Sequence, residues 1–134
     1  MKTVLVVDDE PTIRTLVNAI LDGSGVRTLE AADGPEALDM ARRYQPDLVL
    51  LDVVMPRLDG FTVCQRMKAE KSMARTPVLL LTALAQESDH QRARRVGAEG
   101  IVQKPFSPAA LRATVESILN GGKRGQILSP EKTA

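Results

Sequence analysis

Several residues that suit phosphoryl-transfer chemistry directly follow short apolar runs of the sequence. The runs 4–7, 48–51, 78–81 and 101–103 precede, in this order, Asp8 with Asp9, Asp52, Thr82 and Lys104. A carboxylate can attack phosphorus as a nucleophile, while a hydroxyl group and an ammonium group can stabilise the phosphoryl oxygens. These residue types predict phosphoryl transfer if the folded chain brings them together.

Each polar side chain can be given a role from its type and place. Clustered carboxylates repel one another, so a proton or a bound cation must relieve the repulsion. Oxygen-only ligands favour Mg²⁺, and the adjacent Asp8 and Asp9 suit the holding of an ion. Asp52 stands alone after the third strand and is the predicted nucleophile, which forms an aspartyl phosphate. Thr82 and Lys104 would then hold the phosphoryl oxygens.

The elements that must position these residues can be read from the apolar pattern. Continuous Val and Leu runs separated by helical stretches are typical of strands buried on both faces of a parallel sheet. A more polar run over 26–31 predicts an edge strand. Strict alternation of strand and helix, five times over, predicts right-handed crossovers and a three-layer α/β sandwich. Ligands bind beyond the carboxyl ends of such strands, where the polar residues would meet.

The helical segments show the expected apolar spacing. The first begins at Pro11, and its predicted inward face consists of Ile13, Leu16, Val17, Ile20 and Leu21. Residues 86–97 predict a mostly polar helix with Ala93 and Val96 as apolar anchors, which we expect to lie at the low-stability end of the fold.

Three other kinds of side chain have ordinary structural interpretations. Cys64 lies at helical spacing from apolar neighbours, which predicts a core position. His90, the single histidine, is expected to be solvated. Arg92, Arg94 and Arg95 are expected to form a solvated helix face.

Composition limits the possible partners and location. The 134 residues carry 18 basic and 17 acidic side chains, a net charge of +1, which gives no electrostatic footprint for nucleic acid or an anionic membrane. We therefore expect no direct nucleic-acid or membrane contact. One cysteine cannot form an internal disulfide, and no signal peptide or apolar span is evident, so a cytoplasmic location is predicted.

Taken singly, each motif has a simpler explanation. Asp9 or Glu10 before Pro11 would serve as a helix N-cap, and Thr82 is an ordinary residue for the end of a strand. The sequence Lys104–Pro105 would serve as a solvated turn, although an X–Pro bond there is a candidate cis peptide. The functional interpretation depends on all of these residues meeting at one edge of the sheet.

Four motifs together resemble the response-regulator receiver domain of two-component signalling. They are VLVVDDEP (4–11), LVLLDVVMPRLDG (48–60), LLLTA (79–83) and KPF (104–106). The resemblance covers roughly residues 1–120, which leaves 121–134 as a predicted flexible tail or linker stub. It implies a chemotaxis-regulator-like, flavodoxin-like fold with five parallel strands in the order 2-1-3-4-5 and five helices.

The resemblance also implies a function. A sensor histidine kinase or a phosphotransfer protein would donate a phosphoryl group to Asp52, and the phosphorylated domain would act on an unknown output partner. The implied Mg²⁺ ligands are Asp8, Asp9, Asp52 and the backbone carbonyl of Val54. Thr82 and Lys104 would hold the phosphoryl group, and the bond between Lys104 and Pro105 would be cis.

This sequence departs from the common family pattern at a few positions. Ile101 replaces an aromatic residue that moves with the threonine in many members, and 99–101 lacks the acidic-acidic-Tyr sequence of a charge-paired dimer. Val54 and Leu84 are apolar where other members often carry polar side chains that position water. We therefore expect slow autodephosphorylation.

Three alternatives remain open at this point. A small phosphatase with an aspartyl nucleophile uses similar groups, but its nucleophile begins a DxD motif that is lacking here. A flavin-binding module needs a Ser/Thr/Gly phosphate loop where this chain has three acidic residues. An interaction domain that is never phosphorylated would not require the complete set of acidic, hydroxyl and ammonium groups.

Overall fold

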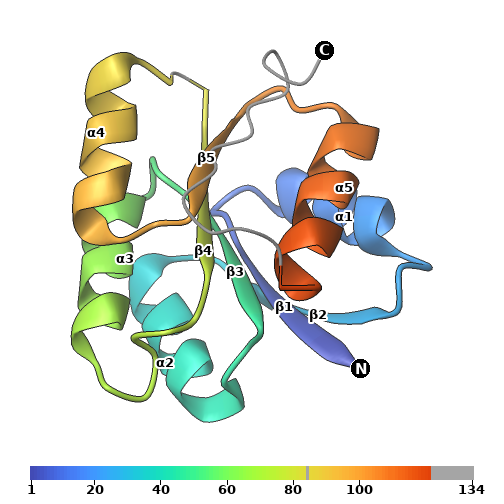
Figure 1. The fold of residues 1–134 in the computed structure, drawn as a ribbon, viewed down its shortest axis with the longest axis horizontal. Coiled ribbons are helices and arrows are strands. Elements are labelled where there is room, and N and C mark those ends of the chain that lie inside the picture. The colour runs from blue at the N-terminus through green and yellow to red at the C-terminus, as the bar shows by residue number, and fades with distance from the viewer. Residues whose placement is uncertain (84, 122–134) are drawn as a thin grey trace.

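The computed structural model describes residues 1–83 and 85–121, which form a three-layer α/β sandwich (Figure 1). Its central sheet consists of β1 (Lys2–Val7), β2 (Val26–Ala31), β3 (Leu48–Asp52), β4 (Val78–Thr82) and β5 (Gly100–Gln103). All neighbouring strands are parallel, and their order is β2-β1-β3-β4-β5. The predicted fold class and strand order are confirmed.

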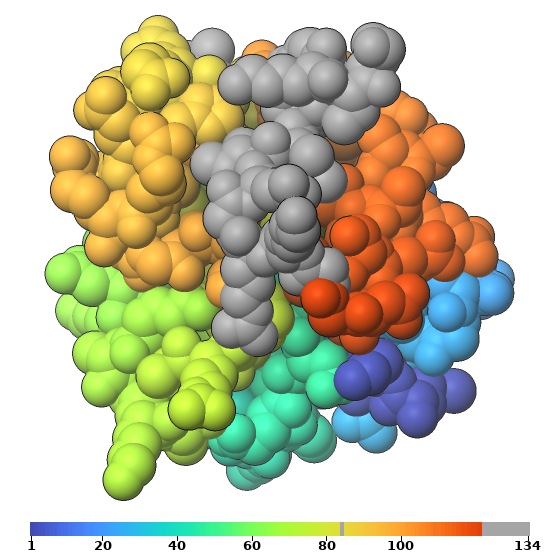
Figure 2. All heavy atoms as spheres, viewed as in Figure 1, coloured from blue at the N-terminus to red at the C-terminus, as the bar shows by residue number. Residues whose placement is uncertain are grey.

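Five helices connect or follow these strands. They are α1 (Pro11–Leu21), α2 (Gly34–Tyr44), α3 (Gly60–Ala69), α4 (Glu87–Val96) and α5 (Pro108–Leu119). Figure 1 shows α1 and α5 on one face of the sheet and α2, α3 and α4 on the other. Figure 2 shows α4 directly above α3 on the outer surface, in agreement with the packing contacts between them.

The strands alternate their side chains between two aliphatic cores. Leu5, Val49 and Leu80 face the core beneath α2, α3 and α4, whereas Val6 and Leu50 face the core beneath α1 and α5. The central strands β3 and β4 are buried throughout, and the edge strand β2 is half-exposed. This is the pattern that continuous apolar runs predict for a sheet covered on both faces.

Side-chain caps fix where three of the helices begin. Asp33, Asp59 and Ser107 each accept a hydrogen bond from the backbone N–H three residues further on, at 2.9, 2.8 and 3.2 Å. Such caps satisfy backbone donors that the first helical turn leaves free. In α1, Glu10 occupies the cap position but makes no capping bond through its side chain. The proposed capping role for Glu10 is therefore wrong.

The structure corrects two predictions of side-chain burial. Leu16 was expected on the inward face of α1 but is 44% exposed, because Val17, Ile20 and Leu21 already fill the contact with the sheet. His90 was expected in solvent but is buried, because it shares the inward face of α4 with Ala93, three residues further on.

Other predictions of burial are confirmed. Cys64 lies in the core, and burial raises the pKa of its thiol to about 12. Ala93 and Val96 anchor α4, while its three arginines are exposed. Leu84 and residues 122–134 lie outside the described residues. Within the described ranges, no helix has the length and apolar character needed to cross a lipid bilayer.

Candidate functional site

The polar residues predicted from the ends of the apolar runs meet at one edge of the sheet. Strand register places Val7 beside Leu51, Asp52 beside Leu81, and Thr82 beside Gln103. The residues at the ends of these strands, or directly after them, therefore converge. A backbone hydrogen bond of 2.7 Å from Lys104 N to Thr82 O ties the last two strand ends together.

Asp8, Asp9 and Asp52 form an acidic cluster at this edge. One carboxylate oxygen from each lies within 4.8 Å of the other two. Asp8 is fully buried and Asp52 nearly so, whereas Asp9 is exposed. The cluster therefore opens to solvent on the side of Asp9.

Lys104 supplies a cation to this acidic cluster. Its Nζ donates hydrogen bonds to Asp8 Oδ2 at 2.8 Å and to Asp52 Oδ1 at 3.2 Å. Burial acts to lower the pKa of the Lys104 ammonium, but the hydrogen bond to Asp8 and the charges of Asp52 and Asp8 outweigh burial and raise it. Lys104 therefore stays protonated at neutral pH.

The electrostatic environment of Asp52 is unfavourable for a carboxylate. Burial and the negative charge of Asp8 raise the pKa of Asp52 to about 6, against the opposing effects of Lys104 and the backbone N–H of Val54. One ammonium group thus does not neutralise the acidic cluster. A second cation, or a proton, would be stabilised there.

The loop between β1 and α1 holds Asp8 by two further bonds. Asp8 Oδ1 accepts a 2.9 Å hydrogen bond from the N–H of Glu10, and its carbonyl oxygen accepts a 2.7 Å bond from Arg14 Nη1. Sequence reasoning missed Arg14. Its place near the start of α1, close to Asp8 and Asp9 in the sequence, was the only indication that it lies near the site. Its hydrogen-bond partners are not evident from the sequence.

The loop between β3 and α3 is held against the end of β3 by close backbone packing at Gly60. The N–H of Gly60 donates to Val53 O at 2.8 Å. A Cβ atom at position 60 would collide with the carbonyl oxygen of Asp52 and lie 2.8 Å from the Cα of Val53. Glycine is therefore needed for the loop to approach the strand so closely.

The remaining predicted site residues lie at or near the same edge. Thr82 is buried at the end of β4, and the peptide bond between Lys104 and Pro105 is cis. Val54 follows Asp52 with its side chain 74% exposed, and its N–H donates to the Asp52 carboxylate. Ile101 is fully buried in the core under α4.

The donor set suits a hard divalent cation. Three carboxylates face one ammonium group, so the charges at the site sum to about −2 when all are ionised. Oxygen ligands and an opening to solvent also fit Mg²⁺, which keeps several of its waters. The residues present therefore fit the predicted ion.

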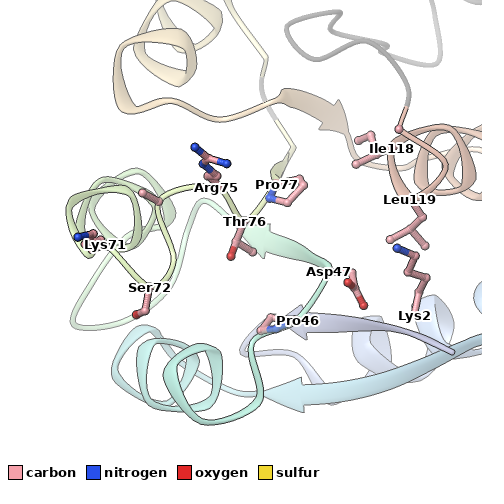
Figure 3. Close-up of a pocket in the computed structure, with 12 residues that line it drawn as sticks. Lys2, Pro46, Asp47, Lys71, Ser72, Arg75, Thr76, Pro77, Ile118 and Leu119 are labelled. Atoms are coloured by element: carbon pink, nitrogen blue, oxygen red, sulfur yellow. The ribbon is translucent and has the colours of Figure 1, made fainter.

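Two crevices differ in their relation to the acidic cluster. The larger, about 740 Å³, lies at the opposite edge of the sheet, between Lys2, Asp47 and Pro77 at the strand starts and Leu119 at the end of α5 (Figure 3). It contains none of the acidic cluster, and we assign it no role in the chemistry. A smaller apolar crevice of about 260 Å³ adjoins the site and is lined by Ile13, Leu16, Ala83, Lys104, Pro105 and Phe106.

Comparison with known proteins identifies the family. The chain matches the family model described as response regulator receiver domain over residues 4–116. It is 43% identical over 129 residues to the alkaline phosphatase synthesis transcriptional regulatory protein PhoP of Bacillus subtilis, an alignment that covers 96% of this chain and 52% of PhoP. It is 40% identical over 119 residues to the DNA-binding dual master transcriptional regulator RpaA of Synechocystis, covering 89% of this chain and 49% of RpaA.

Solved structures agree with these sequence matches. The chemotaxis protein CheY4 of Vibrio cholerae superposes with a TM-score of 0.84 at 36% identity, covering 88% of this chain and 98% of CheY4. The BeF3-activated DrrB receiver domain superposes with a TM-score of 0.80 at 31% identity, covering 90% of this chain and 98% of that one.

The chain belongs to the response regulator receiver domain family, and the predicted resemblance is confirmed. It is a receiver domain of two-component signalling, a class of signalling switches. The chain spans about half the length of the curated relatives it matches.

Proposed function

We propose that Asp52 accepts the phosphoryl group that switches this receiver domain. The observation that carries the proposal is the convergence of Asp52 with Asp8, Asp9 and Lys104 at one edge of the sheet. A carboxylate oxygen of Asp52 would bond to phosphorus as the phosphorus–nitrogen bond of a phosphohistidine breaks. The leaving imidazole keeps the electron pair of that bond. The phosphoryl oxygens would then meet Lys104 and Thr82.

The acidic cluster is the proposed Mg²⁺ site. Asp8, Asp9 and Asp52 would provide carboxylate oxygens, and Val54 its backbone carbonyl. Bound Mg²⁺ supplies positive charge that offsets the repulsion between an incoming phosphoryl group and these carboxylates. Asp8 is already oriented by its bonds to Lys104 and Glu10, so its carboxylate is in place before an ion arrives.

The phosphoryl group would favour a conformer in which Thr82 and Lys104 contact its oxygens, and so shift a pre-existing population. Ile101, fully buried where an aromatic residue is common, would repack without a large change of rotamer. Beyond this transfer, the only chemistry that we assign is slow hydrolysis of the aspartyl phosphate. Val54 has no polar group in its side chain to orient an attacking water.

The proposed phosphodonor is a sensor histidine kinase or phosphotransfer protein that docks beside Asp52. The apolar crevice between α1 and the segment after β5 adjoins Lys104, and Leu16 is exposed on its rim. A partner helix with apolar side chains would cover Leu16 and Ile13 while it presents its phosphohistidine to Asp52. Such a docking surface would give the exposed Leu16 on α1 a role.

The names of the relatives PhoP and RpaA support an output in transcription. We propose that the phosphorylated receiver controls such an output domain or partner, and that residues 1–120 form the receiver and 121–134 a tail or linker. That this chain itself contacts no nucleic acid, and that it acts in the cytoplasm, stay predictions from its charge balance and its single cysteine.

Intact-mass measurement tests the proposed function. Wild-type protein incubated with acetyl phosphate and Mg²⁺ should gain one phosphoryl group, whereas Asp52→Asn should gain none under the same conditions. Asn at position 52 is nearly isosteric and keeps the fold, so it serves as the matched control. Equal phosphorylation of both proteins would refute the assignment of Asp52, and no phosphorylation of either would favour an interaction domain that is never phosphorylated.

A further inference from the structure

We infer that Arg14 is a positioning residue for the acidic cluster, held in place by Glu30; this inference rests on the proposed Mg²⁺ site. Arg14 lies on α1 and Glu30 on the edge strand β2. Neither contributes an oxygen to the cluster, and neither belongs to the motifs that predicted the site. Their role would be to fix the backbone between the two acidic residues that follow β1.

The contact with the acidic cluster is made through the main chain. Arg14 Nη1 donates a 2.7 Å hydrogen bond to the carbonyl oxygen of Asp8, whose peptide plane leads directly into Asp9. The N–H of Asp8 is also bonded, to Ala31 O at 3.2 Å. With both backbone groups of Asp8 bonded, the direction in which the chain presents Asp9 is fixed. Asp9 is the exposed member of the cluster, and packing around its side chain does little to orient it.

A second set of bonds orients Arg14 itself. Its Nε donates to Glu30 Oε1 at 2.8 Å, and Asn18 Nδ2 donates to Glu30 Oε2 at 2.8 Å. Both oxygens of Glu30 are therefore engaged by α1. The side chain of Arg14 is only 17% exposed, so the guanidinium group bridges the Asp8 carbonyl and the Glu30 carboxylate from a half-enclosed position.

The geometry requires arginine rather than a positive charge alone. A guanidinium group presents Nε and Nη1 as separate donors in a fixed plane, and each has its own acceptor here. A lysine ammonium carries its three donors on one nitrogen at the end of a flexible stem, so it does not reproduce the two separate, coplanar donor positions of the guanidinium group. Lysine at position 14 would keep the positive charge but would no longer hold the backbone between Asp8 and Asp9 in place.

Charge and positioning predict opposite effects on Mg²⁺ binding. The positive charge of Arg14 near the cluster repels a cation, so a purely electrostatic role means that its removal tightens binding. A positioning role means that its removal weakens binding, because Asp9 is no longer presented correctly. Loss of residues that orient metal ligands typically lowers metal affinity by about 10- to 100-fold.

Titration calorimetry with MgCl₂ on the full chain, compared across variants, separates these roles. We expect Arg14→Lys and Arg14→Gln both to weaken Mg²⁺ binding by about tenfold. Arg42→Lys is the control, because Arg42 also pairs with a glutamate, Glu70 at 2.6 Å, but is more exposed and lies away from the cluster. It should change the Mg²⁺ dissociation constant by less than about twofold.

A readout without metal checks the same role independently. The N–H of Glu10 donates to Asp8 Oδ1, so its amide hydrogen exchange reports the order of the loop between β1 and α1. Exchange at Glu10 should be faster in Arg14→Lys than in wild type and unchanged in Arg42→Lys. Equally faster exchange throughout β1 and α1 would show a general loss of stability and would overturn the positioning role.

Each alternative outcome is decisive. Equal Mg²⁺ affinity in wild type and Arg14→Lys, or tighter binding in Arg14→Gln, would overturn the positioning role while leaving the proposed metal site intact. Wild-type protein that binds no Mg²⁺ would overturn the proposed metal site itself, and the role of Arg14 in it.

Discussion

Lys104 Nζ lies 2.8 Å from Asp8 Oδ2 and joins by a hydrogen bond two side chains that are 96 residues apart in the sequence. The fold creates this contact, because β1 and β5 end at the same edge of a parallel sheet. The same ammonium group bonds to Asp52 at 3.2 Å. One lysine thus bridges a predicted metal ligand and the predicted phosphoacceptor, and it competes with a cation for both.

Replacing Lys104 should therefore separate metal binding from phosphoryl transfer. Lys104→Met keeps much of the side-chain volume and removes the charge. We expect Mg²⁺ to bind about three- to tenfold more tightly, because no ammonium group competes for Asp8 and Asp52. Phosphorylation by acetyl phosphate should slow by about 100-fold, because a stabiliser of the phosphoryl charge is lost. Calorimetry and mass spectrometry measure the two effects. Weaker Mg²⁺ binding in Lys104→Met would contradict this account.

Asp52→Asn should stabilise the metal-free protein in a way that depends on pH. The pKa of Asp52 rises to about 6 in the folded protein from 3.8, so the folded state favours the protonated acid. The unfolded chain releases this proton first as pH rises, which lowers wild-type stability between about pH 4 and 6. Asn at position 52 has no charge to bury, so the stability of the variant does not fall in this way.

Urea unfolding in the presence of a chelator measures this difference. At about pH 7.5 the variant should be more stable than wild type by about 1–2 kcal/mol. The advantage should shrink steadily toward pH 4.5. A variant that is less stable than wild type at neutral pH would show that Lys104 already compensates the charge of Asp52.

Val54→Asn should shorten the lifetime of the aspartyl phosphate. The exposed side chain at position 54 follows the acceptor by two residues, and a carboxamide there would orient an attacking water. We expect hydrolysis to become several-fold faster in the folded protein. The lifetime in urea-unfolded protein, where position 54 cannot orient water toward the acyl phosphate, is the control. An unchanged lifetime in the folded variant would show that the side chain at position 54 does not control the rate of hydrolysis.

Leu16→Asp should impair transfer from a protein donor but not from a small one. Leu16 is 44% exposed on the rim of the apolar crevice beside Lys104, and burying an aspartate there against a partner is costly. With a phosphorylated kinase that labels wild type, we expect transfer to fall about tenfold or more. Labelling by acetyl phosphate should stay near the wild-type rate.

Tyr44→Asp provides the matched control for the docking surface. Tyr44 is 43% exposed at the end of α2 and lines neither crevice. Its replacement should leave transfer from the kinase unchanged. If Tyr44→Asp impaired transfer as much as Leu16→Asp, the crevice would not be the docking surface.

The fold, and the convergence of the predicted site residues at one sheet edge, could be predicted from the sequence because each depends on a strong local pattern. Strands β3 and β4 are uninterrupted aliphatic runs, and each ends in the polar residue that the chemistry needs. A parallel sheet then places those ends together without further information. The convergence of Asp8, Asp52 and Lys104 follows from topology alone.

What could not be predicted depends on the angular position of single helical residues and on long-range partners. Helical spacing does not distinguish the edge of an apolar face from its centre, so Leu16 was placed inward although neighbours on α1 fill that contact. His90 is polar, but α4 has few apolar residues. The face of α4 that packs on the sheet therefore includes His90 beside Ala93. The hydrogen bond from Arg14 to Glu30 joins two charged residues that lie in different elements. No local sequence pattern predicts that they are partners.

Chemical trapping of the phosphorylated residue tests the central claim most directly. Borohydride reduces an aspartyl phosphate to homoserine, and peptide mapping then locates the modified residue. After incubation with acetyl phosphate and Mg²⁺, we predict homoserine at position 52 alone, and none when a chelator replaces Mg²⁺. Homoserine at position 8 or 9, or modification that persists in Asp52→Asn, would contradict the account.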